Sequence, residues 1–392
     1  MNYPRKILSQ IEKQIKSKEI IILTGMRRTG KTTLYRMLFE YIKSKNKIFL
    51  DMENPIEQKI FEEKDYNNIL LNLAKEGIDS KKKSYIFLDE IQAAPQAIGA
   101  VKYLYDHYNI KFFLTGSSSF YLKNFFPESL AGRKFVFEIF PLDFEEFLVF
   151  KNKAKQFHKN FSQKDKNKNK ISYEKLKKDY DEYIEFGGFP NVVLSKNKID
   201  KKLRLNDIFK SYFEKDARIL ANFKEIKAFR DIILLLMQRV GSKLEISKLA
   251  SEISVSRETV YSFLSFLEAT YFVYFIKPFS RNVDREISGS RKVYLCDNGL
   301  LNNFAKISDG ALFENSIFLN LRNYGKINYY QKRSGGEIDF IVKQTAIEVK
   351  IKGTEFDIKK LYKTAQSIGI KQYYLLTKDF NEKKKFIPAI EL

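Results

Sequence analysis

Short apolar runs alternate with helical segments between residue 19 and about residue 150 of the chain. Each run is rich in β-branched or aromatic residues, as buried strands are. The runs occupy residues 20–23, 47–50, 84–88, 111–114 and 134–139. Strands that alternate with helices in this way predict a parallel sheet with helices on its faces. We therefore expect residues 1–150 to form an α/β domain.

The pattern changes after residue 150. Residues 151–170 are dense in lysine and nearly lack apolar periodicity. This composition favours a solvated, partly disordered insertion over a dedicated nucleic-acid arm. Helical patterning resumes at residue 173, and the sequence Gly-Gly-Phe-Pro interrupts it at 187–190. We expect residues 151–225 to form the insertion and a helical lid.

Residues 226–280 predict a winged helix-turn-helix. Three helical segments are followed by a β-rich segment, and a tight break at Ser254 separates the second helix from the third. The third helix should expose four side chains, namely Arg257, Glu258, Tyr261 and Ser265. One arginine and one glutamate leave two interpretations open, direct reading of DNA bases and a lid or protein-docking module.

Residues 281–392 predict a second α/β domain, in the order helix, three strands, helix and strand. The first helix covers residues 311–324 and includes Glu314. The strand at 336–343 carries Asp339, and the strand at 346–352 carries Glu348 and Lys350. Because side chains alternate along a strand, Glu348 and Lys350 should project from the same face.

The nine-residue segment 25–33, which follows the first apolar run, matches a phosphate-binding loop. The sequence GMRRTGKTT fits the pattern G-x-x-x-x-G-K-[ST] at Gly25, Gly30, Lys31 and Thr32, between a predicted strand and a predicted helix. Glycines let backbone N–H groups turn inward around phosphates at a helix N-terminus. Lys31 should face the β- and γ-phosphates of ATP, and the Thr32 hydroxyl should bind Mg²⁺. The expected nucleotide-binding residues of this segment are Gly25, Arg28, Thr29, Gly30, Lys31, Thr32 and Thr33.

The run YIFLDEIQ supplies a second half for a nucleotide site. Its strand ends in adjacent carboxylates, of which Asp89 should hold the Mg²⁺ shell and Glu90 should polarise the attacking water. A third strand leads into TGSSS, where Thr115 and Ser117 could sense the γ-phosphate or simply cap a helix.

Composition narrows the chemistry further. The 392 residues include one cysteine and two histidines, so any catalysis must rest on carboxylates, lysine and a bound metal. The net charge of +22 favours nucleic acid, DNA before RNA, as partner, although the residue usage of an AT-rich genome weakens this signal. Apolar runs stay shorter than the roughly 18 residues that span a bilayer, which predicts a cytoplasmic protein without a membrane partner.

Taken together, these motifs resemble prokaryotic AAA+-type ATPases that carry a C-terminal nuclease-like domain. The resemblance rests on the phosphate loop, LDEIQ, TGSSS, ESLAGR at 128–133, FPLDFEEF at 140–147 and GGFP. It implies that Arg133 is an arginine sensor or finger, acting within its own subunit or across a homo-oligomer interface. A structural salt bridge is the alternative role for Arg133.

The C-terminal pattern resembles the PD-(D/E)XK nuclease superfamily. This resemblance implies that Asp339 and Glu348 meet around Mg²⁺ or Mn²⁺, that Glu314 adds a carboxylate, and that Lys350 orients or deprotonates the attacking water. An exposed hairpin or a fold with an inactive site is the alternative.

The sequence therefore predicts an ATPase that hydrolyses Mg-ATP and couples it to engagement, and conceivably cleavage, of nucleic acid. The alternative is a nucleotide-operated signalling switch with protein-binding terminal domains and an inactive nuclease fold. An ATP-independent nuclease is disfavoured because both ATPase motifs are intact.

Overall fold

The chain divides into two compact units in a computed structural model that describes residues 3–116, 130–216, 223–280, 286, 289–332 and 335–392. The N-terminal unit comprises residues 1–140 and 269–271, and the C-terminal unit comprises residues 141–268 and 272–392. The sequence predicted four segments, with boundaries at 150, 225 and 280. Within the described residues, no helix is both long enough and apolar enough to cross a membrane.

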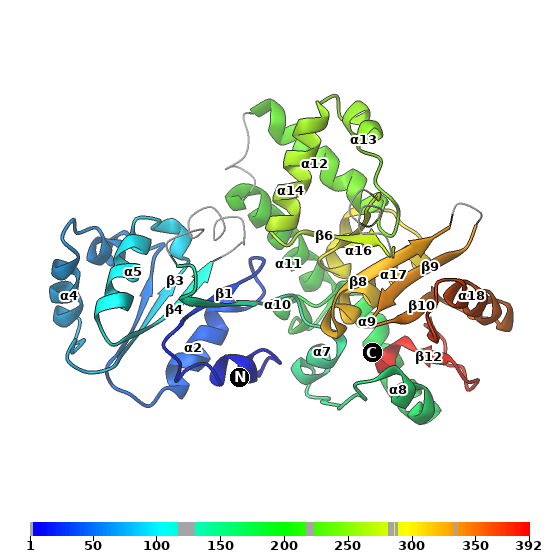
Figure 1. Cartoon of the computed structure of the whole chain (residues 1–392), viewed down its shortest axis with the longest axis horizontal. Helices are drawn as coiled ribbons and strands as arrows, with labels where there is room; N and C mark the ends of the chain where they lie inside the picture. Colours follow the sequence, from blue (N-terminus) through cyan, green and yellow to red (C-terminus); the bar gives the residue numbers. More distant parts are fainter. Residues whose placement is uncertain (1–2, 117–129, 217–222, 281–285, 287–288, 333–334) are drawn as a thin grey trace. The chain divides into compact units, whose positions relative to one another are not determined.

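A five-stranded parallel sheet forms the centre of the N-terminal unit (Figure 1). The strands are β1 (Ile20–Thr24), β2 (Lys47–Asp51), β3 (Ser84–Asp89), β4 (Ile110–Gly116) and β5 (Lys134–Glu138). All five were predicted from the apolar runs. Their order is β2-β3-β4-β1-β5, so β4 lies between β1 and β3. The carboxyl ends of these three strands consequently lie together at one edge of the sheet.

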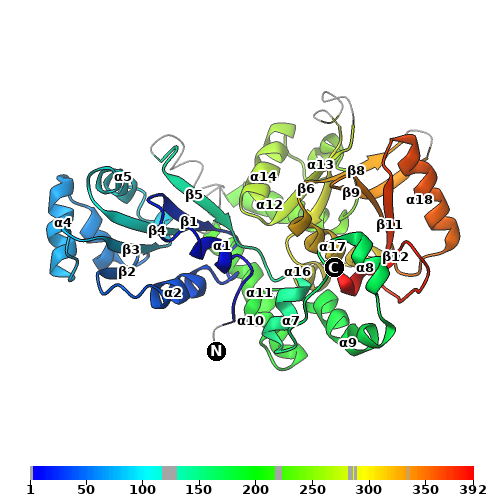
Figure 2. The ribbon, with the colours of Figure 1, turned by 60° about the horizontal axis from the view of Figure 1, so that its bottom comes forward.

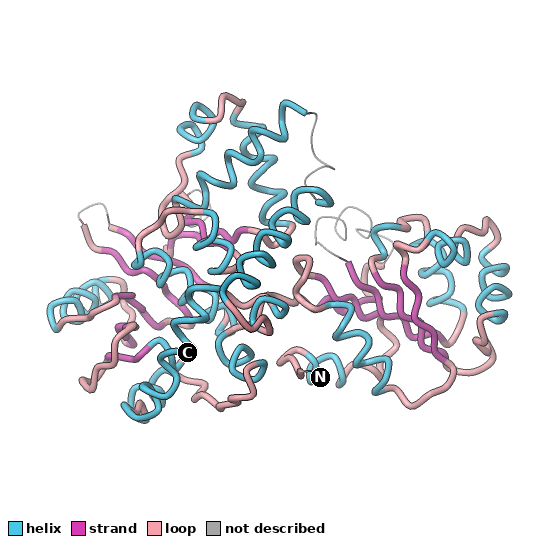
Figure 3. Tube along the Cα trace, turned by 180° about the vertical axis from the view of Figure 1, so that it is seen from behind, coloured by secondary structure: helices cyan, strands magenta, loops and turns pink. Residues whose placement is uncertain are grey.

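Helices cover both faces of this sheet, as the tube of Figure 3 shows. One face buries apolar side chains of α4 (Tyr66–Lys75) and α5 (Ala97–His107), and the other buries those of α1 (Leu8–Glu12) and α2 (Lys31–Tyr41). Tyr35 fixes α2 to the sheet, because its buried hydroxyl donates to the carbonyl oxygens of Ile21 and Leu114, each at 2.9 Å. The remaining helical turns are α3 (Pro55–Gln58), η1 (Lys59–Phe61) and η2 (Ile91–Ala93).

The C-terminal unit contains a seven-stranded mixed sheet in the order β12-β11-β10-β9-β8-β6-β7. Its strands are β6 (Val273–Pro278), β7 (Lys292–Leu295), β8 (Ile327–Gln331), β9 (Glu337–Val342), β10 (Thr345–Lys350), β11 (Gln372–Thr377) and β12 (Phe386–Pro388). Because β6 pairs with both β7 and β8, the boundary predicted at residue 280 falls inside this sheet. The sequence predicted neither β7 nor β12.

Helices of the C-terminal unit both precede its first strand and follow it in the sequence. They are α7 (Phe144–Phe150), α8 (Phe161–Asn167), α9 (Lys170–Phe186), α10 (Pro190–Val193), α11 (Lys198–Ser211), η3 (Tyr212–Asp216), α12 (Phe223–Gln238), α13 (Ile246–Glu252), α14 (Arg257–Ala269), α16 (Asn298–Phe304), α17 (Asp309–Leu321), η5 (Arg322–Tyr324), α18 (Glu355–Ser367) and η6 (Ala389–Glu391). Buried Asp297 holds α9 and α16 together, since its carboxylate accepts from the N–H groups of Gly188 at 2.6 Å and Leu300 at 3.1 Å.

Part of the lysine-rich segment is packed against the chain, although most of its residues are exposed as expected of a solvated insertion. Within it, α8 lies beside β12 (Figures 1 and 2), and Lys164 is only 1% exposed. The ammonium of Lys164 donates to the carbonyl oxygen of Glu391, and that of Lys168 donates to Phe386 at 2.6 Å. Lysine stems can cover apolar surface while their charged ends find acceptors, and these acceptors lie more than 200 residues away in the sequence.

The helices α12, α13 and α14 precede the antiparallel pair β6–β7. Lys243 adds an isolated bridge to Lys292 on the outer side of that pair. The side chains predicted on the outer face of α14 are exposed, while Val260 and Leu264 are buried on its inner face. Part of the loop between β6 and β7 lies outside the described residues.

Candidate nucleotide-binding site

The loop of residues 25–30 connects β1 directly to α2. Gly30 caps α2 in a left-handed conformation, with φ of 96°, which glycine adopts without steric cost. Gly25 has φ of 150°, and a Cβ at this position would lie 2.1 Å from the carbonyl oxygen of Ile139. Both glycines of the predicted pattern therefore meet a local steric demand.

Lys31 and Thr29 turn back onto this loop. The ammonium of Lys31 donates to the carbonyl oxygens of Gly25 at 2.9 Å and Met26 at 3.1 Å. The hydroxyl of Thr29 donates to the same Met26 oxygen at 2.8 Å. Since Lys31 is 4% exposed, its positive charge is held inside the curl of the loop. A cation at this position is suited to an anionic ligand in the loop.

Asp89, Glu90 and Thr115 meet at the same edge of the sheet. Thr115 Oγ1 donates to Asp89 Oδ1 and accepts from the N–H of Glu90 at 2.8 Å. Burial raises the pKa of Asp89, while hydrogen bonds from the hydroxyls of Thr115 and Thr32 oppose that rise. Thr32, predicted as a metal ligand on α2, is thus joined to Asp89 on β3.

Glu90 leaves β3 in a left-handed backbone conformation, with φ of 53°. This conformation is uncommon for a residue with a side chain and is found disproportionately at functional sites. The Glu90 carboxylate accepts a hydrogen bond from the Gln92 amide. The two adjacent carboxylates therefore differ in their environments, because Asp89 is buried and Glu90 is partly exposed.

Other predicted loop residues lie at the surface or outside the described residues. Arg28 and Thr33 are exposed, and Arg28 has a left-handed φ of 67°. Ser117 lies outside the described residues. Sequence reasoning missed Arg5, which is nearly buried and donates to the carbonyl oxygen of Thr29 at 3.0 Å. An isolated arginine near the start of a chain carries no sequence signal for this contact.

Arg133 is not brought to the loop of its own chain. It precedes β5, and its carbonyl oxygen accepts from the N–H of Ile20, the first residue of β1. The 25–30 loop follows the opposite end of β1. The guanidinium of Arg133 instead forms a two-point salt bridge with Asp106, with N–O distances of 2.8 and 3.2 Å. Arg133 thus makes a salt bridge in its own chain, as its alternative role required, and a role across an oligomer interface stays a prediction.

A second group of predicted residues lies in the C-terminal unit. Glu314 Oε1 accepts from the Tyr294 hydroxyl at 2.7 Å, and Asp339 Oδ2 accepts from the N–H of Val349 at 2.8 Å. Lys350 donates to Glu348 Oε1 at 2.8 Å, as expected for residues on one face of a strand. Burial and the nearby charge of Asp339 raise the pKa of Glu314 and of Glu348 to about 7.

Lys292 was not predicted to belong to this group. Its side chain is 5% exposed and donates to Glu337 at 2.8 Å. Burial alone would lower the pKa of Lys292, but the charges of Glu314 and Asp339, together with the hydrogen bond and charge of Glu337, raise it above its ordinary value. The sequence around Lys292 could not predict these contacts, because the partner carboxylates lie on α17 and β9, far away in the sequence.

The metal site expected from Glu314, Asp339 and Glu348 stays a prediction. In the ranges that the structure describes, no three or more acidic, histidine or cysteine side chains are arranged to hold a metal ion. Glu314 accepts from Tyr294, Asp339 from a backbone N–H and Glu348 Oε1 from Lys350, while Glu348 Oε2 is buried without a hydrogen-bond partner among the described residues. The predicted roles of Glu314, Asp339 and Glu348 as metal ligands are therefore not supported.

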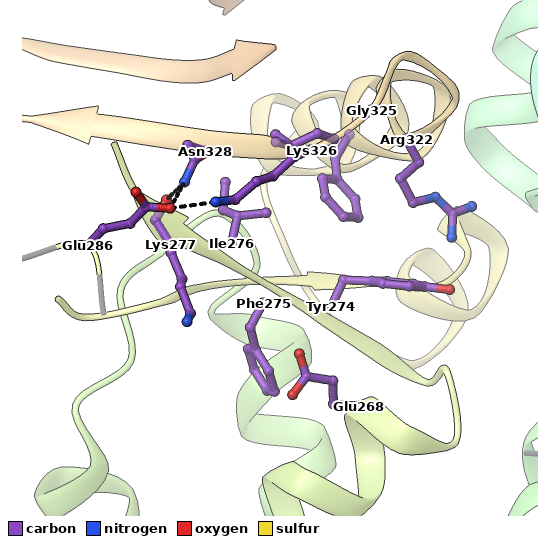
Figure 4. Close-up of a pocket in the computed structure, with 12 residues that line it drawn as sticks. Glu268, Tyr274, Phe275, Ile276, Lys277, Glu286, Arg322, Gly325, Lys326 and Asn328 are labelled. Carbon is purple, nitrogen blue, oxygen red and sulfur yellow. Dashed lines mark hydrogen bonds and ion pairs between the residues drawn. The ribbon is translucent and has the colours of Figure 1, made fainter. Parts of the chain in front are cut away.

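A cavity of about 610 Å³ lies elsewhere in the C-terminal unit, between β6 and the start of β8 (Figure 4). Lys326 and Asn328 both donate to Glu286 at its rim, at 2.6 and 3.5 Å. Arg322 lies over the Tyr274 ring, 4.7 Å from its centroid. The cavity includes none of the predicted site residues.

Two family matches cover separate parts of the chain. Residues 17–148 match the family described as AAA domain, and residues 177–311 match a domain of unknown function, DUF8612. The first match contains the 25–30 loop and the Asp89–Glu90 pair. The N-terminal part of the chain is therefore an AAA-type P-loop domain.

The solved structures that resemble this chain are distant. The Walker-type ATPase PABY2304 of Pyrococcus abyssi is 15% identical, with a TM-score of 0.45, over 77% of this chain and 95% of that protein. The Aeropyrum pernix ORC1 protein, solved in complex with DNA, is 12% identical with a TM-score of 0.34, over 80% and 94% of the two chains.

Curated relatives are closer. An uncharacterised protein of Haemophilus influenzae is 27% identical over 398 residues, which cover 97% of this chain and 94% of the relative. The uncharacterised protein MJ1544 of Methanocaldococcus jannaschii is 34% identical over 346 residues, which cover 85% of this chain and 74% of the relative. The chain therefore belongs to the same protein family as MJ1544, and it carries an AAA domain at residues 17–148.

Proposed function

We propose that the N-terminal unit binds Mg-ATP in the 25–30 loop and hydrolyses it. The observation that carries this proposal is the convergence of the loop, Thr32, Asp89 and Glu90 at one sheet edge, with Thr115 bonded to both carboxylate residues. The match to an AAA domain over residues 17–148 supports it.

The residues at this edge fit a nucleotide and a divalent cation. The inward-turned Lys31 ammonium supplies positive charge for the phosphates, and the loop has no side chain at Gly25 or Gly30 to obstruct them. Asp89 and Thr32 would hold Mg²⁺, which would neutralise charge developing on the phosphates during transfer. Asp89 presents a buried carboxylate beside the Thr32 hydroxyl, a donor set of oxygens that suits this cation.

Glu90 would act as general base toward the attacking water. Its partly exposed carboxylate lies beside Asp89, and the hydrogen bond from its N–H to Thr115 fixes the backbone that carries it. Removing one proton from water during attack requires a carboxylate held in place near the phosphates. The adjacent buried Asp89 is better suited to a cation, because burial penalises an unneutralised charge.

Three variants test this assignment. Lys31→Ala should lose ATP binding, because the charge facing the phosphates is removed. Glu90→Gln should bind ATP normally but hydrolyse it at least about 100-fold more slowly, since an amide cannot accept the proton. Glu40→Gln, which changes an exposed carboxylate on α2, is the matched control and should hydrolyse ATP like the wild type. Equal rates for wild type and Glu90→Gln, in protein freed of contaminating ATPases, would exclude the assignment.

Nucleic-acid binding is a second candidate function. The net charge of +22 favours an anionic partner, and the exposed outer face of α14 offers Arg257 and Tyr261 in the arrangement expected of a winged helix-turn-helix. Cleavage of nucleic acid has no comparable support, because the described carboxylates form no three-ligand metal site.

Salt dependence tests the nucleic-acid candidate. Contacts to backbone phosphates release counterions, so affinity for duplex DNA should fall steeply between about 50 and 200 mM salt. A double variant, Arg257→Gln with Tyr261→Ala, should weaken binding, whereas Lys196→Gln removes an exposed charge outside α14 and should change it little. Undetectable affinity for duplex and single strands at low salt would favour the alternative function, a nucleotide-operated switch that binds proteins.

A further inference from the structure

The two ends of the 25–30 loop are linked to Ile139 and Phe140, the last two residues of the first segment of the N-terminal unit. At one end, the N–H of Ile139 donates to the carbonyl oxygen of Thr24 at 2.8 Å, and Gly25 leaves no room for a Cβ beside the Ile139 oxygen. At the other end, Arg5 joins Thr29 to Phe140. Residue 141 begins the C-terminal unit, so these contacts lie where the chain leaves the AAA domain.

Arg5 makes this second contact with the two arms of its guanidinium. Nη1 donates to the carbonyl oxygen of Thr29 at 3.0 Å, and Nη2 donates to that of Phe140 at 2.8 Å. Arg5 is 9% exposed, its bond to Thr29 is buried and its bond to Phe140 is partly buried. A planar guanidinium can hold two acceptors in a fixed geometry, whereas the point charge of a lysine cannot reproduce that fork.

Tyr271, which belongs to the short second segment of the N-terminal unit (residues 269–271), also contacts Phe140. Its hydroxyl donates to Glu138 at 2.9 Å, and its ring meets that of Phe140 edge-on, with centroids 5.8 Å apart. Its backbone is left-handed, with φ of 62°, a conformation that a bulky residue keeps only when its surroundings enforce it. Tyr271 lies between the end of α14 and the start of β6.

We propose that Arg5 is a positioning residue for the phosphate-binding loop and that, with Tyr271, it relays nucleotide occupancy of this loop to the segment joining α14 to β6. The proposed relay runs through Thr29, Arg5, Phe140 and Tyr271, each in contact with the next. The relay depends on the proposed nucleotide binding, whereas the positioning of the loop by Arg5 does not.

Phosphate binding must disturb the loop end of this relay. The ammonium of Lys31 is buried and donates to the carbonyl oxygens of Gly25 and Met26. A phosphate that binds Lys31 has to share or displace these bonds, which changes the backbone to which Thr29 belongs. Such coupling requires that these contacts differ in free energy between the nucleotide-free and the nucleotide-bound protein. Variants of the residues along the path should therefore alter the coupling.

The first arm of the test uses full-length protein without nucleotide. Amide hydrogen exchange is compared in wild type, Arg5→Lys and Arg36→Lys, where Arg36 is an exposed arginine on α2 and serves as the matched control. Arg5→Lys should raise exchange on the order of tenfold in both the 25–30 loop and residues 139–140, because it removes bonds to a charged donor. Exchange in these segments that is equal in all three proteins overturns the positioning role.

The second arm adds ATP to wild type and to Tyr271→Leu, which loses the ring that contacts Phe140, while Tyr271→Phe keeps that ring and serves as the control. ATP should slow exchange at residues 270–273 in the wild type and in Tyr271→Phe, and Tyr271→Leu should lose this response while keeping wild-type affinity for ATP. Unchanged exchange at 270–273 on ATP binding, or the same response in wild type and Tyr271→Leu, overturns the relay.

Failure of the proposed function gives a different result from failure of this inference. If wild type does not bind ATP, as measured by a fluorescent ATP analogue, the nucleotide-binding proposal fails and the relay fails with it. The positioning role of Arg5 is still decided by the first arm. If Arg5→Lys does not fold, the same exchange measurement is made on Arg5→Gln. If neither variant folds, Arg5 is required for the whole fold, and the proposal that it positions only the 25–30 loop is overturned.

Discussion

The hydroxyl of Thr115 donates a hydrogen bond to the carboxylate of Asp89. The same oxygen accepts from the N–H of Glu90, so one side chain on β4 fixes both residues at the end of β3. This arrangement depends on β4 lying between β1 and β3 in the sheet. Thr115 is therefore placed to align the proposed cation ligand with the proposed base.

Thr115→Val, which keeps the side-chain shape and removes the hydroxyl, should slow ATP hydrolysis about tenfold or more. The reason is that Asp89 loses a donor and the Glu90 backbone loses its acceptor. Affinity for ATP should change less, since Thr115 lies outside the 25–30 loop. Steady-state rates and titration with a fluorescent analogue separate the two effects, and an equal loss of both would argue against the alignment role.

The predicted part of this site was local in sequence. Residues from Gly25 to Thr32 follow one another, and their conformation depends on glycine and on the adjoining strand and helix. The apolar runs likewise predicted all five strands of the first sheet. What the sequence could not provide was their order, because strand order depends on packing between helices and strands far apart in the chain.

Long-range contacts also explain the expectations that were wrong. Lysines at 164 and 168 looked like those of a solvated segment, yet their acceptors, Glu391 and Phe386, come from the end of the chain. Lys292 likewise meets its carboxylate partners only after the second sheet has formed. No local pattern distinguishes a lysine with a distant buried partner from an exposed one.

Gly25→Ala should destabilise the N-terminal unit and weaken ATP binding. The added methyl group would lie 2.1 Å from the Ile139 oxygen, so the loop or residue 139 must move. The control is Gly77→Ala, which also has a positive φ, 91° against 150° at Gly25, but nothing within 4 Å of the added atom. Urea unfolding should show a cost of about 1–2 kcal/mol for Gly77→Ala and a larger cost for Gly25→Ala. Equal costs would mean that the approach of Ile139 is not required.

Lys292→Met should lower the thermal stability of the protein, and so should Glu314→Gln. Lys292→Met leaves the buried Glu314 carboxylate without the nearby positive charge of Lys292, a loss that typically costs about 3–5 kcal/mol. Glu314→Gln should cost less, because Lys292 keeps its salt bridge with Glu337. The double variant removes both charges, so its loss should be smaller than the sum of the two single losses. Thermal unfolding without nucleotide measures this difference. Additive losses would show that the two side chains do not interact.

Manganese provides a separate check of the same group of residues. Addition of Mn²⁺ should change the melting temperatures of wild type and Asp339→Asn by the same amount when no nucleotide is present. The reason is that the positive charges of Lys292 and Lys350 already lie beside the carboxylates. Asp339→Asn is the control. A stabilisation by Mn²⁺ that Asp339→Asn abolishes would restore the metal site predicted from the sequence.

Asp297→Asn should flatten the pH dependence of stability between about pH 4 and 6. Burial raises the pKa of Asp297 to about 6 in the folded protein, against an ordinary value of 3.8. The folded state therefore binds this proton more tightly than the unfolded state does. The resulting contribution to stability, on the order of 3 kcal/mol, is fully present below about pH 4 and is lost as the pH rises through about 6.

Urea midpoints from pH 4 to 7 measure this contribution as the difference between wild type and Asp297→Asn. Other carboxylates titrate in both proteins and cancel in the difference. The variant should also be less stable at pH 4, because one amide oxygen cannot replace both acceptors of Gly188 and Leu300. The difference in urea midpoint between wild type and Asp297→Asn should become smaller from pH 4 to pH 6. Parallel curves would show that Asp297 ionises in the folded protein near its ordinary pKa, with its backbone hydrogen bonds compensating for burial.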